Sequence, residues 1–182
     1  MLACAEDLGM IPTCVPEVLR ALNILTLEIE TMPKTPNTRF SDLTNTPFYS
    51  VDTISTHDMA PLRLWWKQNP DKIEEYWHNV LKQTTPVPTL LSAKDCERII
   101  QHHIESNSLL CIISLQDWLG ISEELRSDKL EQEQINHPEI PRYYWRWRMA
   151  PTIEEMMANS KFNNTIRELV SIRINCNKQH EL

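Results

Sequence analysis

The sequence contains very little glycine. Only Gly9 and Gly120 occur among 182 residues, whereas glycine usually makes up about 7% of a protein. Gly-rich phosphate-binding loops need closely spaced glycines, as in G-x-G-x-x-G or G-x-x-x-x-G-K. Neither pattern is possible here, so this class of nucleotide site is excluded. Turns must instead be formed by the 12 prolines and by Asn, Asp and Ser.

Long apolar runs and clustered positive charge are also lacking. No stretch of about 18 apolar residues is present, so we expect no membrane span. No charged region followed by an apolar stretch and a cleavage site is visible, so we expect no signal peptide and a cytoplasmic location. The formal net charge is −7, and Lys and Arg are scattered among acids, which argues against a nucleic-acid surface.

The cysteines and histidines give no pattern typical of a disulfide framework or a metal site. The five cysteines are widely spaced and include no C-x-x-C pair, so we expect reduced, mostly buried thiols. His102 and His103 stand near Glu105, but adjacent helical residues point to different faces and no third ligand stands at i+4. A solvated helix face is therefore expected there, with no bound metal.

The predicted elements alternate between strands and helices. Strands are expected over residues 1–5, 24–29, 51–55 and 108–115, and helices over residues 16–22, 60–66, 71–81, 95–106 and 153–174. This order favours an α/β fold with a parallel sheet and covering helices. A complete (β/α)8 barrel usually needs about 250 residues. Half of such a barrel fits the length, and an open doubly wound sheet is the alternative.

Two acidic residues follow predicted strands about fifty residues apart. Glu6 follows the first apolar run and Asp58 follows the β-branched run at 51–55. Consecutive parallel strands place both carboxylates at one edge of the sheet. Cleavage of a glycosidic bond needs such a pair, because one group must donate and accept a proton while another stays ionised beside positive charge.

Several longer motifs carry a family resemblance that covers nearly the whole chain. They are AEDLGMIPTCV (5–15), LEIETMPK (27–34), STHD (55–58), LRLWW (62–66), SLQD (114–117), INHP (135–138) and YWRWRM (144–149). With them the sequence resembles the C-terminal half of the 4-α-glucanotransferases of glycoside hydrolase family 77, also called amylomaltases or disproportionating enzymes. It is most similar to the plant cytosolic branch.

The resemblance implies a fold, a reaction and a set of site residues. Residues 1–182 would form strands 5–8 of a TIM barrel with outer helices, as an incomplete catalytic domain. The family transfers α-1,4-glucan segments to a glucose or maltooligosaccharide acceptor with retention of the anomeric configuration. It needs no cofactor or metal. Glu6 is implied as the general acid/base and Asp58 as the stabiliser of the transition state. His57, Asp7 and Asn136 are implied as sugar contacts.

One catalytic part of the family pattern is not found. The family nucleophile is an Asp in an Arg-x-Asp motif after the fourth strand, and the only Arg-x-Asp here, Arg126 to Asp128, lies in a predicted polar loop. We therefore expect a fragment that is inactive alone and whose possible partner is the N-terminal half of the barrel. The alternatives are a non-catalytic module that binds glucan or associates with another half-barrel, and a hydrolase that prefers water as acceptor.

The aromatic residues form two groups. Trp65, Trp66 and Trp77 have helical spacing, which indicates packing in the core. The second group follows the INHP motif and comprises Tyr143, Tyr144, Trp145 and Trp147. These rings have the shape to stack on sugars, but packing in or around the core is the expectation for them as well. Gln116 and Asp117 are expected to end the last strand and to anchor loops by hydrogen bonds.

Overall fold

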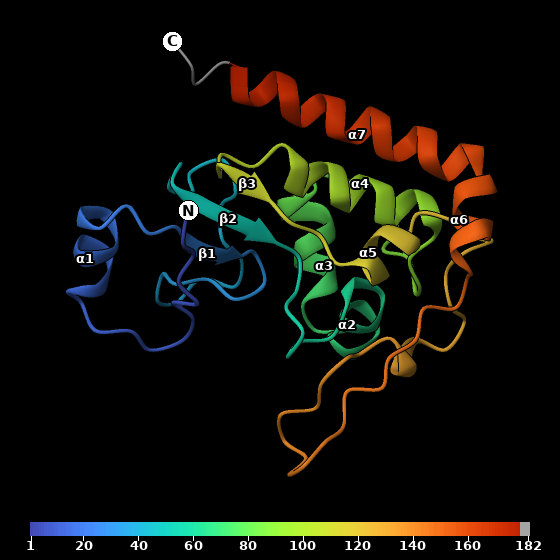
Figure 1. The fold of residues 1–182 in the computed structure, drawn as a ribbon, viewed down its shortest axis with the longest axis horizontal. Helices are drawn as coiled ribbons and strands as arrows, with labels where there is room; N and C mark the ends of the chain where they lie inside the picture. Colours follow the sequence, from blue (N-terminus) through green and yellow to red (C-terminus); the bar gives the residue numbers. More distant parts are fainter. Residues whose placement is uncertain (179–182) are drawn as a thin grey trace.

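The fold is a layer of short parallel strands covered by helices. The computed structural model describes residues 1–178, and side chains as far as residue 174. Strands β1 (Thr26–Ile29), β2 (Ser50–Thr53) and β3 (Leu110–Cys111) are parallel and lie in the order β1-β2-β3 (Figure 1). A parallel bridge between Cys4 and Leu25 adds the first predicted strand beside β1. All four predicted strand positions are therefore found, in chain order, although the elements are shorter.

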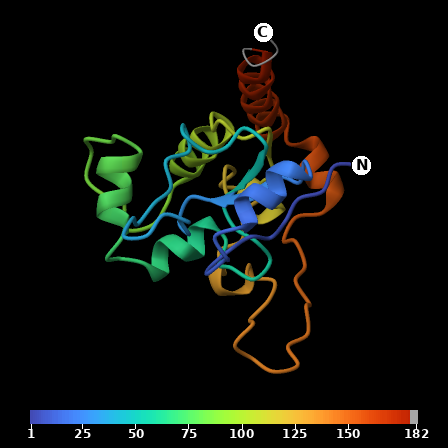
Figure 2. The ribbon, with the colours of Figure 1, turned by 90° about the vertical axis from the view of Figure 1, so that its left-hand side faces the viewer.

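The helices follow the predicted alternation. Their bounds are α1 Val15–Ala21, α2 Leu62–Gln68, α3 Ile73–Glu75, the π-helix η1 Tyr76–Val80, α4 Ala93–Ile104, α5 Leu115–Leu119, the 3-10 helix η2 Leu130–Gln132, α6 Ile153–Ala158 and α7 Ser160–Lys178. Helix α7 lies alongside α4 (Figure 1). Arg173 joins the two, because its Nη1 donates to the carbonyls of Ile104 (3.0 Å) and Ser106 (2.6 Å). The segment between η2 and α6 projects as a long loop (Figure 2).

Helix α5 corrects one prediction. The apolar run 108–115 was expected to be a single strand, but β3 ends at Cys111 and α5 begins at Leu115. Ser114 caps this helix, since its side chain accepts a hydrogen bond from the Asp117 backbone N–H at 3.2 Å. Gln116 and Asp117 consequently lie within a helix and do not end a strand. An apolar run alone does not distinguish a strand from a buried helical turn, whereas the local cap does.

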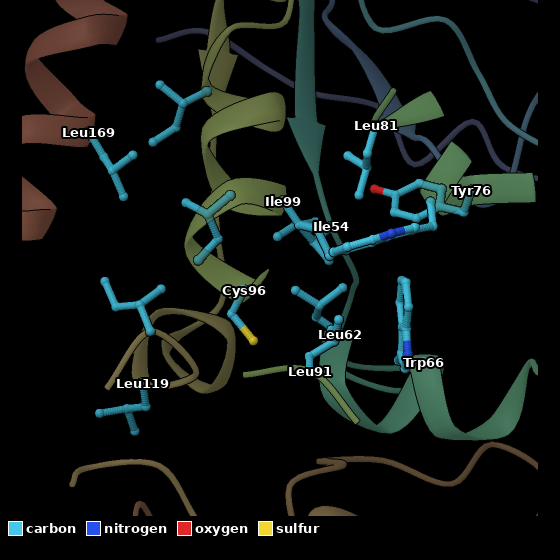
Figure 3. Close-up of a cluster of buried hydrophobic side chains, with 14 of the residues drawn as sticks. Ile54, Leu62, Trp66, Tyr76, Leu81, Leu91, Cys96, Ile99, Leu119 and Leu169 are labelled. Carbon is cyan, nitrogen blue, oxygen red and sulfur yellow. The ribbon is translucent and has the colours of Figure 1, made fainter. Parts of the chain in front are cut away.

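The hydrophobic core lies between the sheet and the helices (Figure 3). Ile99 and Ile100 of α4 are fully buried, and burial of a side chain of this size contributes roughly 1.5–3 kcal/mol. Trp66 and Trp77 pack in the same cluster with their ring centroids 5.8 Å apart, and Trp65 packs against it. The predicted packing role of these three tryptophans is confirmed.

The thiols are more exposed than predicted. Cys96 is buried and Cys111 is half-buried, but Cys4 and Cys14 are exposed, and all four are free. The prediction of mostly buried cysteines is thus wrong at Cys4, which lies beside β1 at one edge of the sheet, and at Cys14, which precedes α1. The side chain of Cys176 lies outside the described residues. Within the described residues, no helix combines the length and apolar character needed to cross a membrane.

A buried polar network connects α4 to the sheet, which corrects the prediction of a solvated helix face. His103 is 2% exposed, and its Nδ1 lies 2.9 Å from Asp52 Oδ2 on β2. The carboxylate of Glu30, just after β1, accepts hydrogen bonds from His102 Nε2 at 2.7 Å and from the Tyr76 hydroxyl at 2.6 Å. The end of α4 packs over the sheet, so that both histidine rings reach Glu30.

The network fixes the charge of His103. Burial by itself lowers the pKa of this imidazole, but the Asp52 carboxylate, through charge and a hydrogen bond, and then Glu30 raise the pKa of His103 to about 9. Its ordinary pKa is 6.5. The ring is therefore protonated at neutral pH and neutralises buried acid. Burial and the adjacent Glu30 also raise the pKa of the Tyr76 hydroxyl.

The raised pKa of His103 predicts a pH-dependent stability. A group with a raised pKa in the folded state stabilises fully below its unfolded pKa and loses this contribution as pH rises through the folded value. The free energy of unfolding, measured by urea denaturation, should fall by on the order of 1–3 kcal/mol between pH 6.5 and 9.

The variant His103→Gln should remove most of that decrease in stability with pH, while His78→Gln should keep it, because the one partner described for the His78 ring is the backbone carbonyl of Gln83. The thiols of Cys96 and Cys111, whose pKa values are raised chiefly by burial, add a further loss of stability above pH 9 in all three proteins. An equal fall in the free energy of unfolding with pH in His103→Gln and in wild type would contradict the raised pKa of His103.

Candidate active site

The two predicted catalytic acids lie past the carboxyl ends of parallel strands. Glu6 stands two residues after Cys4, which bridges to Leu25, and Asp58 stands five residues after the end of β2. Parallel strands direct their carboxyl ends to the same edge of a sheet. Both side chains are exposed. Within the described residues, however, no hydrogen bond or ion pair joins Glu6 to Asp58, so the structure places them at one edge without bringing them into contact.

Three of the five predicted site residues do meet. His57 Nε2 lies 3.4 Å from Asp58 Oδ1, and Asn136 Nδ2 donates a hydrogen bond to the same oxygen at 2.5 Å. The Asn136 backbone N–H also donates to the His57 carbonyl at 3.2 Å. Asp58 and Asn136 are 78 positions apart in the chain. Together with His57 they form one cluster, which we call the Asp58 cluster. The Asn136 amide donates to the Asp58 carboxylate, and the His57 ring lies beside the same oxygen, so the carboxylate has a defined orientation.

Asp117 fixes the segment that carries this cluster. Its carboxylate is 3% exposed and accepts hydrogen bonds from the Leu62 backbone N–H at 2.7 Å and from the hydroxyls of Ser114 at 2.8 Å and Ser55 at 3.3 Å. Burial raises the pKa of Asp117, and these three hydrogen bonds oppose that rise. Because Ser55 and Leu62 flank His57 and Asp58, the anchor sets where the cluster stands. The expected anchoring role of Asp117 is confirmed.

Asp7 has a different environment from the Asp58 cluster. It is 6% exposed, one carboxylate oxygen accepts from the Leu27 backbone N–H at 2.8 Å, and the other pairs with Lys34 Nζ at 2.8 Å. Lys34 also lies 2.8 Å from Glu28. These contacts attach the first strand to β1. Both Asp7 oxygens are engaged by protein donors, and its contact with sugar stays a prediction.

A small pocket opens beside His57, at the ends of β2 and β3. Its volume is about 210 Å³. The lining comprises hydroxyl and amide side chains, His57 and several apolar groups: Thr53, Ser55, Thr56, Met59, Pro61, Ile112, Ile113, Ser114, Gln116 and Ile135. Hydroxyls both donate and accept hydrogen bonds, so this lining suits a ligand rich in hydroxyl groups. Among the described residues, no group of three or more His, Cys, Asp or Glu side chains has an arrangement that would hold a metal ion.

Two aromatic residues of the loop after Asn136 lie outside the core, which corrects the prediction of packing for Tyr144 and Trp145. Tyr144 and Trp145 are 69% and 59% exposed. Trp145 lies beside the Asp58 cluster, with its ring centroid 5.0 Å from that of His57. Sequence reasoning did not place it there, because the loop that carries it has no regular period. The only available signal was its position a few residues after Asn136.

The chain is similar to proteins of one family. The family described as 4-alpha-glucanotransferase, glycoside hydrolase family 77, matches residues 1–154. The 4-alpha-glucanotransferase DPE2 of Oryza sativa subsp. japonica is 32% identical over 171 residues, which cover 94% of this chain and 18% of the relative. A 4-alpha-glucanotransferase of Chlamydia caviae is 30% identical over 174 residues, covering 94% and 32%.

Two solved structures share the fold. The amylomaltase from Streptococcus agalactiae in complex with acarbose superposes with a TM-score of 0.70 at 20% identity, covering 93% of this chain and 31% of the other. The amylomaltase from Corynebacterium glutamicum gives a TM-score of 0.60 at 16% identity, covering 91% and 28%. The chain thus spans about a fifth to a third of the length of these relatives.

The Asp117 anchor predicts a loss of stability on substitution. Asp117→Ala should lower the free energy of unfolding by roughly 2–3 kcal/mol, because it leaves the buried Leu62 N–H without an acceptor. Asp117→Asn keeps an acceptor and should cost less. The exposed Asp128 offers a control, since Asp128→Ala should change stability by no more than about 0.5 kcal/mol. Urea denaturation measures the stability of all three variants. If the urea midpoint of Asp117→Ala equals that of wild type, the anchoring role of Asp117 is refuted.

Proposed function

This chain belongs to the 4-alpha-glucanotransferase family, and on that premise we propose that it forms the second half, strands 5–8, of a glucanotransferase barrel. In this proposal the complete enzyme transfers α-1,4-glucan segments to a glucose or maltooligosaccharide acceptor. The sheet order supports it, because successive strands of a (β/α)8 barrel are parallel neighbours. The likeness to two amylomaltase structures supports it as well.

The proposed roles follow from the chemistry of a retaining transfer. Glu6, as the acid, gives its proton to the glycosidic oxygen as the bond to the departing glucan breaks. A nucleophile takes the other glucan segment as a covalent intermediate. Glu6, now a base, removes the proton from the acceptor hydroxyl, and the acceptor oxygen displaces the nucleophile. Asp58 remains an anion and stabilises the positive charge that develops on the sugar ring.

The Asp58 cluster is the single observation that carries this proposal. Asn136 and His57 both approach Oδ1 of Asp58. Within the described residues, Oδ2 has no hydrogen-bond partner, which leaves it for a sugar hydroxyl. His57 has one ring edge at Asp58 and also lines the small pocket. A carboxylate oriented by an amide donor, beside a pocket lined by both hydroxyl and apolar groups, is an arrangement suited to binding a sugar ring.

The nucleophile is proposed to come from outside these 182 residues. The Arg126 to Asp128 segment lies in the loop between α5 and η2, where Asp128 is exposed and follows no strand. Without an attacking carboxylate, covalent catalysis has no first step. We therefore propose that the chain alone does not transfer glucan and that it acts with a complementary half-barrel.

A second candidate is a module that binds glucan or associates with another half-barrel without catalysis. The edge of the sheet at β3 favours this candidate. Leu110 and Ile112 there are 42% and 58% exposed, and Leu110 lies on the outermost strand. Exposed apolar residues on an unpaired strand edge favour pairing with another chain. The two candidates differ in whether a chemical step takes place once the second half-barrel is present.

A chimera separates the candidates and tests Glu6. The part of the Chlamydia caviae relative that this chain does not match is joined ahead of the 182 residues, and maltotriose disproportionation is followed by product chromatography. The chimera should be active, and Glu6→Gln should lower the rate by about 10²–10⁴, the contribution typical of general acid–base catalysis. Glu17→Gln, an exposed Glu in α1, is the matched control and should retain the rate.

The possible results of this experiment distinguish a transferase, a non-catalytic module and a hydrolase. A chimera that folds and binds maltooligosaccharide without turnover would favour the non-catalytic module. Full activity in Glu6→Gln would refute the acid/base assignment. Glucose released without longer products would show water as the acceptor, and hence a hydrolase. The unfused chain, tested alone, should give no products.

A further inference from the structure

We propose that Trp145 is a sugar-binding residue, whose indole face stacks on the glucosyl unit next to the one held at Asp58. This inference rests on the proposed function, because it assumes that the Asp58 cluster binds glucan. It adds a binding residue that neither the motifs nor the family resemblance assigns. The ligand class is a neutral maltooligosaccharide.

The exposure of Trp145 is the first observation. The side chain remains 59% exposed although it lies against His57, with ring centroids 5.0 Å apart and planes inclined at 44°. Most of the indole is thus available to a ligand that already contacts His57. A large exposed aromatic ring beside a polar cluster is typical of a binding surface, because it offers an apolar face at low cost in conformational entropy.

The position of Trp145 is defined by contacts on both sides of it in the chain. Before it, Asn136 is attached to His57 and Asp58, and the rings of His137 and Tyr143 meet edge to face at 4.9 Å. After it, Trp147 Nε1 donates to Glu133 at 3.4 Å. The loop therefore returns to the site at Trp145. A stacking residue needs this kind of support if its ring is to be preorganised.

The surrounding charges and hydroxyls identify the ligand as a neutral sugar. The pocket beside His57 is lined by hydroxyl, amide and apolar groups, with no Lys or Arg among its lining residues. The nearby Asp58 carboxylate repels anions. A pyranose ring presents hydroxyls at its rim and C–H groups on its faces. Its hydroxyls can form hydrogen bonds with the pocket, and its C–H groups can pack against the indole of Trp145. A phosphorylated sugar would find no Lys or Arg among the lining residues described for this pocket.

Tyr144 provides a matched control on the same loop. It is even more exposed than Trp145, at 69%, but its ring lies under the Arg146 guanidinium at 5.2 Å. Among the described contacts none joins Tyr144 to His57. If any exposed aromatic on this loop bound sugar, the two residues would be equivalent. The inference requires that they differ.

Calorimetric titration of the full 182-residue chain with maltoheptaose tests the inference. Trp145→Ala should weaken binding about tenfold, the effect expected from loss of one aromatic stacking contact. Trp145→Phe keeps an aromatic face and should bind within about threefold of wild type. Tyr144→Ala should bind as wild type does. Thermal unfolding midpoints should agree among the variants, because the side chain of Trp145 is mostly exposed.

Fluorescence gives a second readout that a purely structural role would not produce. Saturating maltoheptaose should change the tryptophan emission of the wild type, and Trp145→Phe should lose that change while still binding. If Trp145→Ala binds as tightly as wild type, the inference is overturned and the proposed function stands. If the wild-type chain does not bind maltoheptaose, the inference about Trp145 is overturned, whereas the proposed function is decided separately by turnover in the chimera. Equal weakening by Tyr144→Ala would overturn the assignment to Trp145.

Discussion

The parallel pairing of successive strands is the constraint on which the site depends. The Leu25 N–H donates to the Ala3 carbonyl and the Ala5 N–H to the Leu25 carbonyl, each at 2.8 Å, and β1, β2 and β3 continue the same direction. Residues that follow these strands therefore come to one edge of the sheet. Glu6 and Asp58 reach the same edge for this reason alone. Side-chain contacts with His57 and Asn136 then refine the position of Asp58, but they do not create that placement.

Two buried polar networks maintain this arrangement, one within the sheet and the other at its edge. Asp52 is fully buried on the central strand, and the protonated His103 compensates its charge, since an unpaired buried carboxylate would be strongly destabilising. Asp117 acts at the edge of the sheet, where it accepts hydrogen bonds from both ends of the segment that holds the Asp58 cluster. The first network joins α4 to the sheet, and the second attaches the segment that carries the Asp58 cluster to α5.

The sequence predicted the alternation of strands and helices, because short apolar runs and amphipathic segments are local patterns. It did not predict α5, whose start depends on the Ser114 cap within an apolar run. It misplaced His102 and His103, since a search for partners along one helix cannot find Glu30, 72 residues away. The meeting of Asn136 with Asp58 was implied only by family resemblance, and Trp145 was expected to pack in or around the core, whereas it lies against His57. Long-range contacts made by irregular loops leave no periodic signal in a sequence.

The most direct test of the account is a crystal structure of the chain with bound maltoheptaose. The account predicts one glucosyl unit, or two consecutive units, in contact with both Glu6 and Asp58, because the two acids must act at the same glycosidic bond. Sugar bound at Asp58 with Glu6 directed away from it, beyond the reach of the glycosidic oxygen, would contradict the account.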